Sequence, residues 1–313
     1  MSDGANGASQ LRFVSEYLIF GQPIRASMPM HDTLGVTKRR LNTLLGEEEE
    51  AIVREVMEKG SMEQDAYGWA DADWCAYITD ESAQEHALPP GMPSSTLDQG
   101  HAGPRLSDFV THPAARAAKL DTAQVLALRL YTCSVYRSIN MPLRTGCTLT
   151  RPHPFPALVA HLTEGLKQLR SAALQSGDNS VGARVLWRGV RDRGIADEFF
   201  ERGGTECAPM STTSDRRVAE EYATRLDAAG NAPATSVLFK IVVDNFLHCG
   251  AEISFLSCFP SEAEWLFPPN TYLLPTQHGA DAAGAGGDVR RRGVMEKTES
   301  GADIEVVEVK PSF

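Results

Sequence analysis

The chain has 313 residues, 42% of them hydrophobic and 23% charged, which is enough apolar material for one large domain or two ordinary ones. Its formal net charge of −11 argues against nucleic acid as a partner, because phosphate backbones are held mainly by clustered Lys and Arg. No apolar run approaches the roughly 20 residues of a transmembrane helix, and residues 1–10 lack the pattern of a signal peptide. These features predict a cytoplasmic protein without a membrane span.

The cysteines and histidines do not form a metal-binding pattern. No Cys-x-x-Cys pair is present, whereas structural zinc sites need closely spaced ligands and disulfide frameworks are typical of short secreted chains. The pattern favours free thiols in a reducing compartment. His153 and His161 have no further ligand cluster near them in the sequence and are interpreted as structural. The six cysteines are Cys75, Cys133, Cys147, Cys207, Cys249 and Cys258.

Residues 1–105 predict an extension of unclear role that is partly helical. Residues 47–59 have helical apolar spacing behind a run of glutamates, which is typical of a solvated helix start. Trp69 and Trp74 lie among aspartates and are interpreted as packing residues. Residues 88–103, rich in Pro, Gly and Ser, predict a linker.

Two longer helices are predicted next. Residues 121–139 carry an apolar stripe, with Asp121 as the cap and Asn140-Met-Pro142 as the stop. Residues 156–174 carry leucines at helical spacing.

After Gly182 the sequence pattern changes to short apolar runs separated by turns, which predict strands. One helix, capped by Asp215 and extending to about residue 226, interrupts them. A Gly/Ala-rich stretch indicates a mobile loop at about residues 277–300. Helices first and strands later predict an α+β domain rather than a doubly wound sheet. The predicted strands are 185–187, 237–243, 252–256, 264–267 and 304–309.

Three elements of the strand-rich part could form a site for chemistry, and a fourth, the predicted turn Ser257-Cys258-Phe259-Pro260, would present Glu262 to a partner. The chain has no phosphate-binding P-loop, Rossmann glycine pattern or metalloprotease motif. The first is Arg188, at the end of an apolar strand and followed by Gly189. A buried guanidinium needs an anion, and a pyrophosphate would supply one, while glycine lets a ligand approach the backbone. The alternative is an arginine whose head group reaches solvent at a strand end.

The second element is Ser211-Thr212-Thr213-Ser214, directly before the predicted helix at Asp215. Hydroxyls on a strand edge can hold the site arginine and reach a ligand. The alternative is that this run only caps the helix, in which Ser214 is expected to take part.

The third element is Glu262-Ala263-Glu264, directly before an apolar strand. Because strand side chains alternate, the two carboxylates are expected on one face, about 7 Å apart. They would repel one another unless a cation or sugar hydroxyls lay between them. The alternative is an ordinary solvated surface pair.

The order of these three elements resembles the arginine-specific NAD-dependent mono-ADP-ribosyltransferases. Weaker similarity lies in 106–109 and 131–144, and 304–309 looks like the family's closing strand, so the resemblance covers about residues 106–311. The chain departs from the pattern at two positions. Thr213 stands third in the hydroxyl run, and Trp265 stands where a smaller aliphatic residue is usual.

The resemblance implies a fold, a domain division and residue roles. The fold would be a split α+β domain with NAD in the cleft between two small sheets, formed by residues 106–313 as the catalytic domain. Arg188 would hold NAD phosphate, Gly189 would bond the nicotinamide carboxamide, and Ser211, with Thr212 beside it, would position NAD. Glu264 would bond the ribose 2′-hydroxyl and Glu262 would engage the acceptor guanidinium.

The chemistry agrees with these roles. Cleavage of the nicotinamide–ribose bond leaves an oxocarbenium-like centre that a fixed carboxylate stabilises in the transition state. A second carboxylate can orient the acceptor guanidinium and accept its proton late. The implied partners are NAD and a protein arginine, with no metal, nucleic acid or membrane, and the sequence indicates no oligomeric state.

Two alternatives to this function stay open. An NAD glycohydrolase would use the same site with water as the acceptor, and a non-catalytic module would bind NAD without turnover. Arg290, Arg291 and Arg292 form a basic run in the predicted loop, and they are either sites of automodification or a plain solvated charge run.

Overall fold

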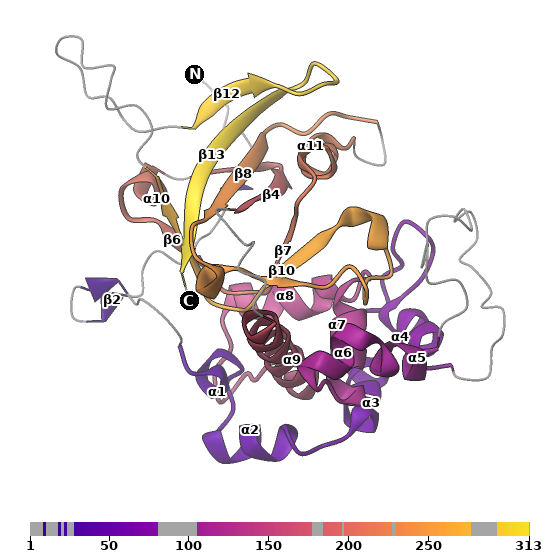
Figure 1. Ribbon diagram of the computed structural model, residues 1–313. Coiled ribbons are helices and arrows are strands. Elements are labelled where there is room, and N and C mark those ends of the chain that lie inside the picture. The colour runs from indigo at the N-terminus through magenta and orange to yellow at the C-terminus, as the bar shows by residue number, and fades with distance from the viewer. Residues whose placement is uncertain are drawn as a thin grey trace, which may run out of the picture.

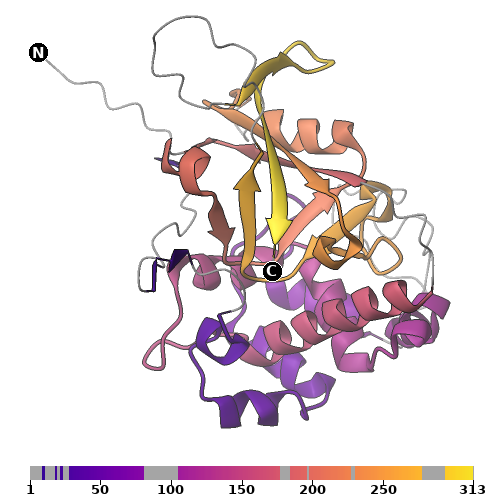
Figure 2. The ribbon, with the colours of Figure 1, turned by 60° about the vertical axis from the view of Figure 1, so that its left-hand side comes forward.

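The computed structural model describes residues 28–80, 105–176, 184–195, 197–226, 230–276 and 293–312, together with three dipeptide strands near the amino end. Helices α1 to α9 form one layer and most of the strands form a second layer beside it (Figures 1 and 2). The α+β class is therefore confirmed. The helices are α1 (Met30–Thr33), α2 (Lys38–Leu44), α3 (Glu49–Lys59), α4 (Asp71–Thr79), α5 (Leu106–Thr111), α6 (Pro113–Ala118), α7 (Thr122–Tyr131), α8 (Tyr136–Thr145), α9 (Pro156–Gln175), α10 (Asp197–Arg202) and α11 (Arg216–Thr224).

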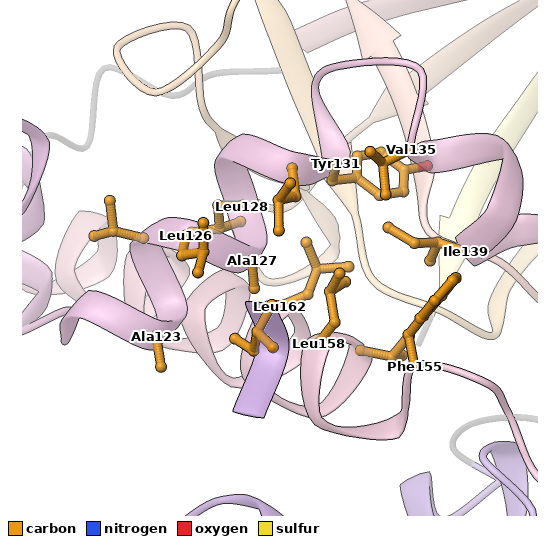
Figure 3. Close-up of a cluster of buried hydrophobic side chains, with 14 of the residues drawn as sticks. Ala123, Leu126, Ala127, Leu128, Tyr131, Val135, Ile139, Phe155, Leu158 and Leu162 are labelled. Atoms are coloured by element: carbon orange, nitrogen blue, oxygen red, sulfur yellow. The ribbon is translucent and has the colours of Figure 1, made fainter. Parts of the chain in front are cut away.

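The helical layer has one apolar core, built around α7 and α9. Figure 3 shows Leu126 and Leu128 of α7 opposite Leu158 and Leu162 of α9, and all four side chains are fully buried. Ile52 of α3 belongs to the same core. Helices from both sides of residue 105 are thus packed together, which the 3.6-residue apolar spacing of each helix makes possible.

The start of α9 is stabilised by a residue far away in the sequence. Glu55 of α3 accepts hydrogen bonds from the backbone N–H groups of Ala157 and Leu158 at 2.9 and 3.1 Å. These are unpaired donors of a helix start, where a negative charge is favoured by the helix dipole. Burial nevertheless raises the pKa of Glu55 to about 7.

The predicted helix 121–139 is two helices, so its expected stop at Pro142 was wrong. Asp121 caps α7 as predicted, but α7 ends at Tyr131 with Thr132 as its C-cap, where the Thr132 hydroxyl bonds the Arg129 carbonyl oxygen at 2.8 Å. α8 then passes through Pro142 and stops at Gly146, whose φ of +84° only glycine adopts easily. The predicted helices at 47–59 and 156–174 are confirmed by α3 and α9.

Nine strands form one mixed sheet in the order β6-β11-β13-β8-β4-β7-β10-β9, with β12 paired to β13. Strand β13 is parallel to β8, and the other pairs are antiparallel. The strands are β4 (Arg184–Arg191), β6 (Gly204–Glu206), β7 (Met210–Thr213), β8 (Ser236–Val243), β9 (Ala251–Glu252), β10 (Glu264–Phe267), β11 (Thr271–Pro275), β12 (Val294–Lys297) and β13 (Asp303–Ser312). The remaining short strands are β1 (Ser9–Gln10), β2 (Leu18–Ile19), β3 (Gln22–Pro23) and β5 (Arg193–Gly194).

The sheet is nearly divided in two. Strand β4 pairs with β7 at a single position, Trp187 opposite Thr213, whereas β4 pairs with β8 along its whole length. The expected split is thus present as two parts of one sheet joined at one residue pair. Beyond Trp187, β4 diverges from β7 at the next residue, Arg188.

Two other predicted segments of the strand-rich part are not found as predicted in the described residues. The predicted strand 252–256 is wrong beyond Glu252, because a turn follows in which Leu256 N–H bonds the Ile253 carbonyl at 2.8 Å. The predicted mobile loop lies outside the described residues over 277–292, including Arg290, Arg291 and Arg292, while 294–297 form β12.

Candidate active site

Three strands bring the predicted site residues together. Arg188 lies on β4, Ser211 on β7 and Glu264 at the start of β10. Glu264 is paired with Thr213 across the sheet, and Ser211 lies diagonally from Glu264 on the same face. The site therefore occupies the point where the two parts of the sheet separate.

Arg188 is held from two sides. Its Nη1 donates to the Ser211 carbonyl oxygen at 2.7 Å, and its Nη2 lies 3.9 Å from Oε2 of Glu206 on β6. Burial lowers the pKa of Arg188, and the negative charge of Glu206 opposes that effect. The guanidinium stands in a site that favours an anionic neighbour.

Arg144, which sequence reasoning gave no role, belongs to the same cluster. Its Nε and Nη2 donate to the two carboxylate oxygens of Glu206, both at 3.0 Å. Glu206 therefore stands between two guanidinium groups, those of Arg144 and Arg188. In the sequence, Arg144 was marked only by lying in a segment that resembles the family. No sequence motif indicates that Arg144 pairs with Glu206, which is 62 residues away.

Tyr131 forms a further wall of the site. Its buried hydroxyl donates to the Pro209 carbonyl oxygen at 2.7 Å and accepts from Nδ2 of Asn140 at 3.1 Å. Burial raises the pKa of Tyr131, and the charges of Arg188 and Glu264 both act on it. Helix α7 thus lines the site with a phenol that stays neutral, and α8 contributes the neutral amide of Asn140 beside the charged Arg144.

Glu264 is a buried carboxyl group whose proton is held more tightly than usual. Its side chain is 5% exposed, and burial raises its pKa to about 7. A hydrogen bond from Ser211 and another from Ser257 Oγ, at 3.5 Å from Oε2, partly oppose this effect, and so does the charge of Arg188. The negative charge of Glu262 adds to it.

Glu262 does not lie on a strand, so the expectation that strand alternation places both glutamates on one face was wrong. Glu262 ends a short 3₁₀ helix, η2 (Pro260–Glu262), and Ala263 has a left-handed φ of 47° before β10 begins. The two carboxyl groups still interact, as the effect of Glu262 on Glu264 indicates. Burial also raises the pKa of Glu262, against the charge of Arg225.

The threonines of the hydroxyl run support the backbone. Thr212 is buried on the face of β7 opposite to Ser211, and its hydroxyl donates to the Trp265 carbonyl oxygen at 2.8 Å. The Thr213 hydroxyl donates to the Glu262 carbonyl oxygen at 2.7 Å. Asp215 caps α11 as predicted, through its bond to the Arg217 N–H.

Gly189 is required by a close helix rather than by a ligand alone. A Cβ there would collide with the Ala219 carbonyl oxygen and lie 2.9 Å from the Ala223 nitrogen, both in α11. We expect Gly189→Ala to lower the free energy of unfolding by about 2–3 kcal/mol, as overpacking does. Urea unfolding measures this effect. Gly194→Ala is the control, because a Cβ at Gly194 meets nothing within 4 Å; equal stability of the two variants would contradict the prediction.

The raised pKa of Glu264 predicts a pH dependence. If its carboxylate is the active form, kcat/KM for NAD cleavage should fall about tenfold per pH unit below about 7, as the group becomes protonated. Since the Ser211 hydrogen bond lowers this pKa, Ser211→Ala should move the acidic limb of the profile to higher pH. A limb that stays in place in Ser211→Ala would contradict the assignment.

Two findings apply to the described part of the chain alone. No helix there has the length and apolar composition that a membrane span requires. In the same residues, no three His, Cys, Asp or Glu side chains are grouped as a metal site would need.

His153 and His161 bond the carbonyl oxygens of Ile139 and Leu44, at 2.9 and 3.1 Å, which confirms their structural interpretation.

An arginine on one strand, a serine diagonally across from a buried glutamate on the neighbouring strand, and a second glutamate two residues earlier define a site of the NAD-dependent ADP-ribosyltransferase class. Residues 105–285 match the model of the family described as NAD:arginine ADP-ribosyltransferase. The match covers more than half of the chain, and the protein therefore belongs to this family.

Individual relatives agree with the family assignment. The chain is 30% identical over 166 residues to ecto-ADP-ribosyltransferase 5 of Rattus norvegicus, covering 50% of this chain and 48% of that protein. For the Mus musculus protein of the same name the identity is 32% over 167 residues, with the same coverage. The chain thus spans about half the length of the relatives it matches. Among solved structures, ADP-ribosyltransferase HopU1 of Pseudomonas syringae pv. Tomato DC3000 is 17% identical with a TM-score of 0.48, covering 83% of this chain and 96% of that one.

Proposed function

We propose that the protein transfers ADP-ribose from NAD to an arginine of another protein and releases nicotinamide. The observation that carries this proposal is the buried Glu264 carboxyl group, which lies diagonally from Ser211 on one face of the sheet and feels the charges of Arg188 and Glu262. A carboxylate that is fixed and poorly solvated stabilises positive charge far more than one in water.

The site suits the pyrophosphate of NAD. Arg188 and Arg144 share one carboxylate, that of Glu206, so this cluster carries an excess positive charge in a partly buried place. An entering pyrophosphate would satisfy the second guanidinium with bidentate bonds. Ser211 then orients the nicotinamide ribose beside Glu264, next to the backbone of Gly189.

The chain's own groups divide the chemistry between them. The Glu264 carboxylate bonds the ribose 2′-hydroxyl and stabilises the positive charge that develops as the bond between ribose C1′ and nicotinamide breaks. Nicotinamide leaves with the electron pair of that bond. Glu262 holds the acceptor guanidinium, one nitrogen of which bonds to C1′ and gives its proton to Glu262.

The test is an assay with labelled NAD and agmatine, a small guanidine, on the wild type, Glu262→Gln and Glu264→Gln. We expect the wild type to label agmatine, Glu262→Gln to release nicotinamide without labelling agmatine, and Glu264→Gln to do neither. Nicotinamide release by the wild type without labelled agmatine would favour the glycohydrolase. NAD binding without release would favour the non-catalytic module.

We also propose a reducing, cytoplasmic compartment, which the six free thiols support. The rat and mouse relatives carry "ecto" in their names, so the proposal needs its own test. Tagged protein in the membrane-free soluble fraction of cells, with all six thiols reactive after denaturation, would agree with it. Recovery from the medium with disulfides would contradict it.

A further inference from the structure

The segment that carries Glu262 is supported by the helical layer. We call residues 253–263, which link β9 to β10, the glutamate turn. Its backbone is bonded twice to the end of α7: Arg129 Nη1 donates to the Leu256 carbonyl oxygen, and the Thr132 hydroxyl accepts from the Cys258 N–H, both at 3.0 Å. Arg129 itself is buried over the Phe109 ring, 4.0 Å from its centre.

A second support comes from an aromatic cluster in residues 61–80. Trp74 of α4 is fully buried, and its indole N–H donates to Asp65 at 2.8 Å. The same carboxylate accepts the backbone N–H groups of Tyr67 and Trp69 at 2.8 and 3.1 Å, which fixes the loop before α4. We call Tyr67, Trp69, Trp74 and Tyr77 the aromatic cluster; the rings of Trp69, Trp74 and Tyr77 lie 4.8 to 6.2 Å from one another.

Phe259 of the glutamate turn packs directly on this cluster. Its ring stacks on Tyr67 with a centroid distance of 6.4 Å and meets Trp74 edge-on at 6.3 Å. Such ring pairs contribute beyond their buried area and define an orientation. The position of Phe259 is therefore set by residues of α4 and the loop before it.

The link from Phe259 to Glu262 is short and direct. The Phe259 carbonyl oxygen accepts the Glu262 N–H at 3.0 Å, which forms the single turn of η2. Glu264, in contrast, is held by β10 pairing with β7 and by Ser211. A shift of Phe259 should thus displace Glu262 more than Glu264.

We propose that the aromatic cluster positions Glu262 and thereby favours transfer to arginine over hydrolysis of NAD. The cluster lies outside residues 105–285, the part that matches the family model. The inference rests on the proposed function, because it assigns Glu262 to the acceptor. It gives residues 61–80 a role in catalysis without contact to the reacting atoms.

The experiment measures agmatine labelling and NAD hydrolysis side by side in the full chain. In Tyr67→Ala and Trp74→Phe, we expect kcat for transfer to fall about tenfold or more while hydrolysis stays within about twofold, because misplacement of one group affects only the step it serves. Tyr67→Phe keeps the ring and should restore the wild-type ratio of transfer to hydrolysis. Trp74→Phe keeps a ring in the core and loses only the Asp65 bond and part of the packing.

A matched control separates positioning from general destabilisation. Leu41→Ala, in α2, removes a partly buried side chain from the same apolar core without touching the glutamate turn. If Leu41→Ala lowers the Tm as much as Tyr67→Ala does, it should still leave the ratio of transfer to hydrolysis unchanged. Two results would overturn the inference but not the proposed function: equal falls of transfer and hydrolysis in Tyr67→Ala, or a change of the transfer-to-hydrolysis ratio in Leu41→Ala as large as that in Tyr67→Ala. A wild type that hydrolyses NAD but labels no guanidine would overturn the proposed function, and the inference with it.

Discussion

Glu264→Gln is expected to reduce nicotinamide release about 100- to 1000-fold, the loss found when one preorganised charge-stabilising group is removed. Glutamine keeps the shape and the hydrogen bond to Ser211 but cannot carry the negative charge. The Kd for NAD should therefore change little. Single-turnover release of labelled nicotinamide, with NAD binding by calorimetry, measures both quantities.

Stability provides the control for this variant. Because the folded-state pKa of Glu264 is raised to about 7, the ionised side chain opposes folding at higher pH, and its replacement by a neutral amide removes that cost. At pH 8 the Tm of Glu264→Gln should thus be no lower than that of the wild type. Full activity in this variant would contradict the role given to Glu264.

Arg188→Lys is expected to weaken NAD binding about 10- to 100-fold, which corresponds to the ~1.5–3 kcal/mol of a hydrogen bond to a charged group. Lysine keeps the charge but loses the flat fork that binds the Ser211 carbonyl oxygen and a phosphate at once. Equilibrium binding of NAD checks the prediction. Since Arg144 still pairs with Glu206, the variant should remain folded.

The same exchange at an exposed arginine is the control. Arg217 lies on α11 and pairs with Asp215 at 2.9 Å, so Arg217→Lys should leave NAD binding as it is. Unchanged NAD affinity in Arg188→Lys would show that this arginine supports β7 without holding the ligand. Arg144, which also pairs with Glu206, would then be the next residue to test for phosphate binding.

Much of the site could be predicted because it depends on local order. Glu264 begins β10, whereas Arg188 and Ser211 lie within β4 and β7, and the strand order brings the three together. The expectation that Arg188 ends its strand was wrong, because β4 continues to Arg191. The geometry of Glu262 could not be predicted, since Ala263 adopts a left-handed φ that its residue type does not favour. The pairing of Arg144 with Glu206 was also beyond reach, because it depends on where β6 lies in the sheet.

The fold, like the site, could be predicted from the sequence only in part. Periodicity predicted α3 and α9, whose apolar faces repeat over three or more turns. It failed at the ends of two elements: α7 stops at Tyr131 although the apolar stripe continues, and β9 has only two residues because a backbone turn follows Glu252. The support of the glutamate turn by Trp74 needed the tertiary structure, because the two lie far apart in sequence.

The position of β13 determines when the site is completed during synthesis. This strand lies between β11 and β8, although its residues, 303–312, follow all the other strands in the sequence. In the described sheet, β6 and β11 are connected to the remaining strands through β13. A chain growing from its amino end can pair β4 with β8 early, but Glu206 on β6 reaches the two arginines only after β13 has been made. Unfinished chains are therefore expected to lack a complete NAD site.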